Sequence, residues 1–142
     1  MLRVGTDADI SLIAEMEKQI FSDPWQKADI ADFLVKPHLR LFVWVEEKRV
    51  LGYLLGSVIA PEGEIYRVAV LPEARRHGAG AALCGALLYE SDTVYLEVRR
   101  GNSSARALYE KLGFTLMGER KNYYKNPTED ACLYRWEKVL CE

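Results

Sequence analysis

The sequence predicts a single α/β (α+β) domain over residues 1–142, with a mixed central sheet of about seven strands flanked by about four helices. Two observations support this prediction. Short apolar runs rich in β-branched residues alternate with segments whose apolar residues recur at helical spacing. Three strands follow one another through tight turns, whereas later strands are separated by helices, so antiparallel and parallel pairs share one sheet. The predicted element order is β-α-α-β-β-β-α-β-α-β-β.

The first third of the chain predicts one strand and two helices. Residues 2–4 form a short strand, and Thr6 followed by Asp9 is typical of a capping box at a helix start. Pro24 disfavours helix before it, and a second helix is expected over residues 27–35. The apolar positions of the first helix are Ile10, Ile13, Met16 and Ile20.

The middle of the chain predicts three consecutive strands. Residues 39–46 and 50–60 flank a charged turn at 47–49. Residues 61–63 then turn the chain into a third strand, 64–71, which is rich in β-branched residues. The remaining elements are a helix over 81–89, a strand over 93–98, a helix from Gly101 to Gly113, and strands over 114–124 and 131–140 around a polar loop, 125–130.

Composition excludes several classes of protein. A net charge of −2 with 28% charged residues implies no general affinity for nucleic acid. No apolar run approaches about 18 residues and the N-terminus lacks a signal-peptide core, so we expect no membrane association and a cytoplasmic location. Cys84, Cys132 and Cys141 fit neither a disulfide framework nor a zinc motif, and the first two are expected to be buried. With only two histidines, we expect no metal site.

A glycine-bearing segment follows the third of these strands. Arg75, Gly78 and Gly80 form an Arg-x-x-Gly-x-Gly pattern immediately before a predicted helix. A helix start leaves backbone N–H groups without partners, and glycine lets a phosphate approach them closely. The pattern lacks the spacing of a P-loop or a dinucleotide fingerprint. Two readings remain open, a phosphate site and a helix cap with close packing.

This pattern resembles the pyrophosphate loop of the GNAT superfamily of N-acetyltransferases, which bind acetyl-coenzyme A. The segment LEVRRGNSSARALYEKLGF, together with residues 120–124, resembles the ribosomal-protein-alanine (RimI-type) branch. Residues 21–25 also resemble the substrate-side loop of that branch. The resemblance covers nearly the whole chain and implies the GNAT fold. It also implies acetyl transfer to the N-terminal alanine of a small-subunit ribosomal protein.

The resemblance also implies roles for individual residues. Glu97 matches the proton-accepting glutamate and Tyr109 the proton-donating tyrosine. Spacing alone leaves two other readings open, a strand-end Glu97 paired with Arg99 or Arg100 and a Tyr109 that serves the core. The coenzyme-binding residues that the resemblance implies are Val68, Ala69, Val70, Arg76, His77, Gly78, Ala79, Gly80, Ala81 and Asn102.

The acceptor is the least determined part of the sequence reading. A small-molecule amine is the alternative to a peptide, and a non-catalytic acyl-coenzyme A sensor is a third reading. Aromatic and acidic residues crowd the last predicted hairpin, at Tyr123, Tyr124, Glu129 and Asp130. This pattern favours a basic peptide acceptor. We expect a monomer or a weak dimer.

Overall fold

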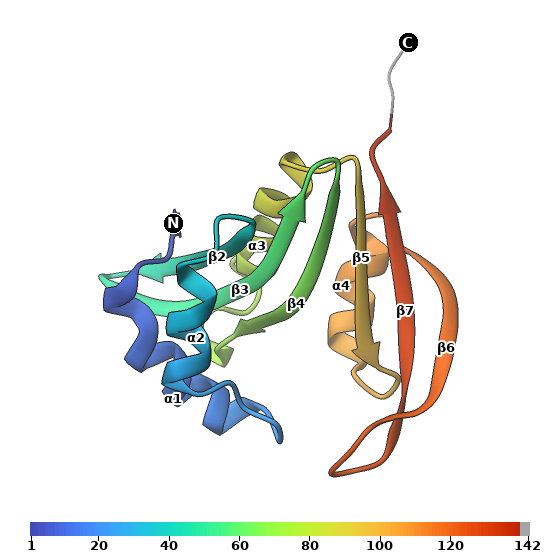
Figure 1. Cartoon of the computed structure of the whole chain (residues 1–142), viewed down its shortest axis with the longest axis horizontal. Helices are drawn as coiled ribbons and strands as arrows, with labels where there is room; N and C mark the ends of the chain where they lie inside the picture. The colour runs from blue at the N-terminus through green and yellow to red at the C-terminus, as the bar shows by residue number, and fades with distance from the viewer. Residues whose placement is uncertain (140–142) are drawn as a thin grey trace.

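The computed structural model describes residues 1–139, and within them a twisted seven-stranded sheet carries helices on both faces (Figure 1). The strand order is β1-β2-β3-β4-β5-β7-β6. The strands are β1 (Leu2–Val4), β2 (Leu39–Glu46), β3 (Arg49–Ile59), β4 (Glu62–Val70), β5 (Thr93–Arg99), β6 (Thr115–Tyr124) and β7 (Glu129–Glu137). The helices are α1 (Ile10–Ile20), α2 (Lys27–Leu34), α3 (Ala79–Tyr89) and α4 (Ser103–Lys111), with short 3-10 turns η1 (Asp7–Asp9) and η2 (Pro72–Ala74).

The predicted fold class and element order are confirmed. Every neighbouring pair of strands is antiparallel except β4 and β5, which are parallel. The parallel pair arises because α3 carries the chain from the end of β4 back to the start of β5. The predicted capping box at Thr6 and Asp9 is also present.

Two apolar clusters hold the helices against the sheet. One lies beneath α1 and α2 and includes Ile13, Ile30 and Tyr53, while the other lies beneath α3 and α4. β3 contributes to both clusters, because its interior residues are buried on both faces. Cys84 and Cys132 are buried as predicted, and Cys141 falls outside the described residues.

Several element boundaries differ from the sequence prediction. α3 begins at Ala79, two residues before the expected start, because Gly78 adopts a left-handed conformation that opens the helix there. β4 begins at Glu62, where a turn was predicted. Gly63 lies in that strand because it pairs with Val58 of β3 and Val94 of β5, and the position requires glycine since a Cβ would lie 2.5 Å from the Ser91 hydroxyl oxygen. β7 begins at Glu129 rather than two residues later.

A bulge in β4 opens the sheet. Leu55 pairs with Arg67 and the next residue of β3 pairs with Ile65, so Tyr66 is the extra residue. The parallel ladder between β4 and β5 ends at Ile65 and Leu96, next to this bulge. Beyond that point the two strands diverge (Figure 1). One edge of β4 therefore has no strand partner where the resemblance places the coenzyme.

Within residues 1–139, no helix is both long enough and apolar enough to cross a membrane. The same residues contain no group of three or more His, Cys, Asp or Glu side chains placed to hold a metal ion.

Candidate active site

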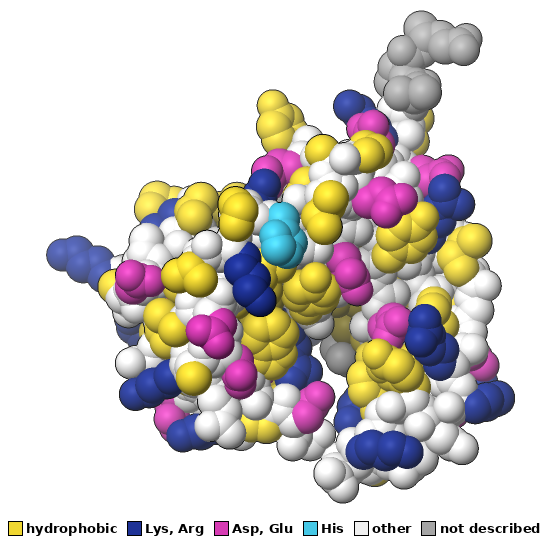
Figure 2. Space-filling model, viewed as in Figure 1, with side chains coloured by type: hydrophobic (Ala, Val, Ile, Leu, Met, Phe, Trp, Pro, Cys, Tyr) yellow, Lys and Arg dark blue, Asp and Glu magenta, His cyan; other side chains and the backbone are white. Residues whose placement is uncertain are grey.

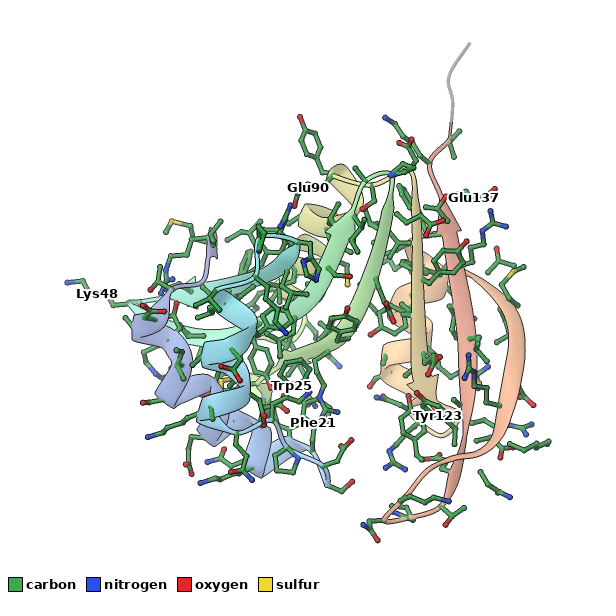
Figure 3. All side chains as sticks on the ribbon, viewed as in Figure 1. Phe21, Trp25, Lys48, Glu90, Tyr123 and Glu137 are labelled. Carbon is green, nitrogen blue, oxygen red and sulfur yellow. The ribbon has the colours of Figure 1, made fainter. Side chains whose placement is uncertain are left out.

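A groove of about 470 Å³ lies where β4 and β5 separate. It brings together four of the sequence-predicted residues, Glu97, Tyr109, Val68 and Asn102. The other predicted residues, Ala69, Val70 and residues 76–81, do not line it. The loop after α1 forms one wall, and the turn between β6 and β7 forms the opposite wall. Figure 3 shows Phe21 and Trp25 on one side of the opening and Tyr123 on the other. Figure 2 shows that the surface is hollowed there, with acidic side chains beside the hollow.

Glu97 lies on β5 just past the end of the parallel ladder, and its side chain is 29% exposed. Its partner is not Arg99 or Arg100, as one sequence reading had it, but Arg120 of β6, whose Nε lies 3.6 Å from Oε1. Interaction with the Glu97 carboxylate raises the pKa of the nearby Tyr123 hydroxyl. Glu97 is therefore held in place while remaining accessible from the groove.

A second carboxylate accompanies Glu97 on the same side of the sheet. Burial, and then the charge of Glu97, raise the pKa of Glu64 on β4. Glu64 was not predicted as a site residue; it lies one position before Ile65, the last residue of the ladder. Glu97 lines the groove and Glu64 lies close enough to feel its charge, so the two carboxylates create a negative potential that attracts a cationic amine.

Tyr109 belongs to the core and to the groove at once. Only 5% of its surface is exposed, and its ring packs against Phe114 and Tyr134 at centroid distances of 5.6 and 6.3 Å. Burial raises the pKa of Tyr109 well above its ordinary value, so the phenol stays protonated. Among the described residues no hydrogen bond to its hydroxyl is found, which leaves that proton available to a ligand in the groove.

Asn102 starts α4 and has a structural task of its own. Its carboxamide oxygen accepts a hydrogen bond from the Ala105 N–H at 3.3 Å, as an N-cap residue does. Its amide NH₂ remains as the group that could donate to a ligand. Beside it, the Gly101 N–H donates to the Glu129 carboxylate at 2.7 Å, and a Cβ at Gly101 would collide with that oxygen.

The two glycines of the predicted phosphate loop have different tasks. Gly78 is the N-cap of α3 with φ +78°, and a Cβ there meets no atom within 4 Å, so space is open at the helix start. A Cβ at Gly80 would instead lie 3.0 Å from a methyl of Leu108, so Gly80 serves the close packing of α3 on α4. The reading as a helix cap with close packing is therefore confirmed, and the phosphate site stays a prediction for which Gly78 leaves room.

The charged side chains of this loop turn in different directions. Arg75 Nε donates to the Val70 carbonyl at 3.3 Å and ties the loop to the end of β4. His77 Nδ1 lies 2.8 Å from the Glu46 carboxylate of β2, so its side chain is occupied within the protein. Arg76 has φ +73° and is exposed. All three residues are exposed, and among the described residues no side-chain hydrogen bond or ion pair is found for Arg76.

Val68, Ala69 and Val70 offer their backbone groups, rather than their side chains, to a ligand in the gap between β4 and β5. Val68 and Val70 pack toward α3 and α4, and Ala69 packs beneath α1 and α2. Because no strand pairs with this edge of β4 after Ile65 in the described chain, alternate N–H and C=O groups face the gap. Such groups can hydrogen-bond a ligand lying in the gap.

A buried polar network that the sequence analysis missed fixes the α1 side of the groove. Glu17 of α1 is fully buried and accepts hydrogen bonds from the Trp25 N–H at 2.9 Å and the Tyr53 hydroxyl at 2.5 Å. Arg67 Nε lies 3.3 Å away, close enough for charge attraction, although its N–H does not point at the carboxylate. Arg67 also binds the Asp23 carbonyl at 2.6 Å. Glu17 follows Ile13 at i+4, which places it on the apolar face of the helix. This spacing could have indicated from the sequence that Glu17 is buried.

The carboxylates of the last hairpin are engaged within the chain. Glu129 pairs with Arg99 at 3.2 Å, and Asp130 accepts from the Lys121 amine and the Asn122 N–H. Internal partners therefore compensate their charges. Glu129 nevertheless lines the groove, together with Glu97 and Asp23.

Comparisons of the sequence and of the structure with known proteins all point to N-acetyltransferases. The sequence profile of the Acetyltransferase (GNAT) family matches residues 10–114. The [ribosomal protein bS18]-alanine N-acetyltransferase of Haemophilus influenzae is 32% identical over 125 residues, 84% of each chain. The N-alpha-acetyltransferase RimI of Mycobacterium tuberculosis is 35% identical over 138 residues, 92% of this chain and 87% of that protein. The crystal structure of the Escherichia coli ribosomal-protein-S18-alanine N-acetyltransferase superposes with a TM-score of 0.88 at 26% identity, covering 100% of this chain and 96% of that one.

Proposed function

Because this chain belongs to the GNAT family of acetyltransferases, which use acetyl-coenzyme A, we propose that it is a protein N-α-acetyltransferase acting on the N-terminal alanine of a small-subunit ribosomal protein. The observation that carries the proposal is that Glu97 and Tyr109 line one groove, between the loop after α1 and the turn between β6 and β7. The names of the relatives supply the acceptor class.

The coenzyme site of the proposal runs along β4 to the start of α3. The open space at Gly78 and the free N–H groups of the first helical turn, from Ala79 to Ala81, suit a pyrophosphate. Arg76 adds a positive charge beside them. His77 is engaged within the chain, through its ring with Glu46 and through its N–H with the Ala74 carbonyl at 3.2 Å. The unpaired edge of Val68 to Val70 would hold the pantetheine arm by hydrogen bonds, and the amide of Asn102 would reach the same groove. Acetyl-coenzyme A supplies the activated acetyl group.

The amine must lose a proton before it can attack. Glu97 is placed to accept that proton, directly or through a water molecule, and Arg120 and Tyr123 hold its carboxylate in position. An α-amine has an ordinary pKa near 7.7–8.0, against about 10.4 for a lysine side chain. Proton transfer to a carboxylate is therefore less unfavourable from an N-terminal amine than from a lysine side chain, and this difference favours an α-amine acceptor.

Two further groups complete the proposed chemistry. A free N–H on the edge of β4 stabilises negative charge on the acyl oxygen, a contribution of roughly 3–4 kcal/mol in comparable sites. Tyr109 donates its proton toward the departing sulfur, and its raised pKa keeps the phenol protonated throughout the working pH range. These roles rest on the position of each group in the groove.

The test is a competition among acceptors. The protein is incubated with acetyl-coenzyme A and an alanine-started peptide, the same peptide with its N-terminus formylated, free lysine, and spermidine, and products are identified by mass spectrometry. We expect acetylation of the free α-amine of the first peptide and little of the others. Equal turnover of spermidine and peptide would overturn the proposed acceptor, and no acetyl transfer to any amine would favour an acyl-coenzyme A sensor.

A further inference from the structure

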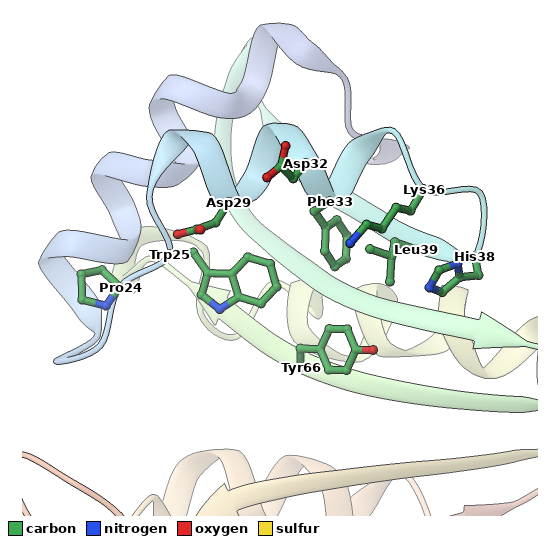
Figure 4. A pocket seen from close by; sticks show the side chains of 9 residues that line it. All are labelled: Pro24, Trp25, Asp29, Asp32, Phe33, Lys36, His38, Leu39 and Tyr66. Carbon is green, nitrogen blue, oxygen red and sulfur yellow. The ribbon is translucent and has the colours of Figure 1, made fainter.

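A second cavity, of about 670 Å³, lies beside the groove and takes no part in the mechanism above (Figure 4). Three aromatic rings line it, from Trp25, Phe33 and Tyr66. Trp25 and Tyr66 are stacked with centroids 6.4 Å apart and an interplanar angle of 27°, and Phe33 meets each of them edge-on. We refer to this cavity, lined by these three rings and the polar side chains described next, as the aromatic cleft.

Charged side chains are segregated along the rim of the aromatic cleft. Asp29 and Asp32 lie on α2 at i and i+3, and Figure 4 shows Asp29 above the indole of Trp25. Lys36 and His38 lie at the other end, after the helix. No ion pair or hydrogen bond of Asp32 is found among the described residues, and its side chain is exposed. One end of the cleft is therefore acidic and aromatic, and the opposite end is basic.

The aromatic cleft is held in shape and adjoins the groove. The backbone N–H of Trp25 is fixed by the buried carboxylate of Glu17 at 2.9 Å. Tyr66 is the bulged residue of β4 and lines both the cleft and the groove that contains Glu97. A chain entering the groove with its N-terminal amine at Glu97 can therefore continue past Tyr66 into the cleft.

We propose that the aromatic cleft binds a lysine or arginine side chain of the acceptor, downstream of the residue that is acetylated. The inference rests on the proposed function, because it requires a peptide acceptor. A cation gains from the faces of Trp25 and Tyr66 and from the two aspartates, whereas Lys36 excludes it from the far end. Because an extended chain advances about 3.3 Å per residue, a side chain a few residues beyond the amine reaches a neighbouring cavity.

The experiment measures kcat/KM, by coenzyme A release, for alanine-started octapeptides. Each has a neutral background and a single arginine at one of positions two to six, and alanyl-alanine amide serves as the minimal acceptor. We expect arginine at one position to raise kcat/KM by about five- to tenfold, mainly through KM. Added salt should reduce the gain.

Three variants assign that gain to the cleft. Asp32→Asn should abolish most of it and leave turnover of the minimal acceptor unchanged. Lys36→Gln should enlarge it, and structural damage does not produce an increase of this kind. Glu15→Gln removes an equal charge from the exposed face of α1, outside the cleft, and should change nothing.

The outcomes separate this inference from the proposed function. Turnover of the minimal acceptor with no positional arginine effect, or with a gain that Asp32→Asn leaves intact, overturns the cleft assignment alone. A glutamate or phenylalanine that raises kcat/KM more than arginine at the same position also overturns it. Absence of turnover on every peptide overturns the proposed function and this inference together.

Discussion

The buried network around Glu17 permits a quantitative prediction. Glu17→Leu keeps a similar volume but removes the buried carboxylate beside the Arg67 guanidinium, whose side chain is only 14% exposed, and leaves it with the exposed carboxylate of Asp23 at 3.2 Å. The same change leaves the Tyr53 hydroxyl and the Trp25 N–H without their acceptor. Removing one partner of a buried ion pair costs about 3–5 kcal/mol. A domain of this kind has only about 5–15 kcal/mol of total stability, so the variant should be severely destabilised.

The assay is urea unfolding followed by tryptophan fluorescence, with the free energy of unfolding extrapolated to water. The matched control is Glu73→Gln, which breaks an ion pair with Arg49 of similar length, 3.2 Å, whose side chains are 65% and 50% exposed. That control should cost about 0–1 kcal/mol. The double variant Glu17→Leu with Arg67→Met should regain much of the loss, because neither charge then remains buried. A cost for Glu17→Leu no larger than that of the control would refute the reasoning.

Three further predictions concern the coenzyme site, the proton donor and the N-terminal turn. Gly78→Asp should weaken acetyl-coenzyme A binding about tenfold relative to Gly78→Asn in calorimetry, because the two side chains tolerate the left-handed backbone alike and only aspartate repels phosphate. Tyr109→Phe should lower kcat about 10²-fold yet leave the urea midpoint nearly unchanged, since the ring packing stays; a parallel loss of stability would contradict the assignment. Asp9→Asn should cost about 1 kcal/mol at neutral pH. Arg3 and then the Thr6 N–H lower the pKa of Asp9, so this contribution is present above the unfolded pKa of about 3.9 and is lost as pH falls through the folded pKa. Urea unfolding should show the variant and the parent converging in acid, and a pH-independent difference would count against the ion pair.

The sequence predicted the fold because each level of its pattern agrees with the others. Helical spacing at Ile13 and Met16, alternation in β2, and glycine at position 78 all specify the elements that the structure has. The convergence of Glu97 and Tyr109 could be predicted only through the family resemblance, because β5 and α4 are brought together by tertiary packing.

What the sequence could not predict depends on long-range geometry. The bulge at Tyr66 reverses which residues of β4 face each side of the sheet. It is recognised from the shift in pairing between β4 and β3, which only the folded structure shows. Glu97 pairs with Arg120 of β6, two strands away in the sheet. Arg99 shares the face of Glu97 but is engaged by Glu129 and by the carbonyls of Pro127 and Lys125. Likewise Glu129 could not be paired with Arg99 until the hairpin was placed.

The measurement that tests the account most directly is the pH dependence of peptide acetylation by Glu97→Gln. The substitution keeps the volume and the contact with Arg120 but removes the base, so turnover at neutral pH should fall about 10²–10⁴-fold. Acetyl-coenzyme A affinity should be nearly unchanged. As pH rises above about 8 the α-amine is already neutral, and the variant should approach the parent. Parent-level turnover by the variant at neutral pH would contradict the account, and a defect that persists unchanged at high pH would contradict the base role.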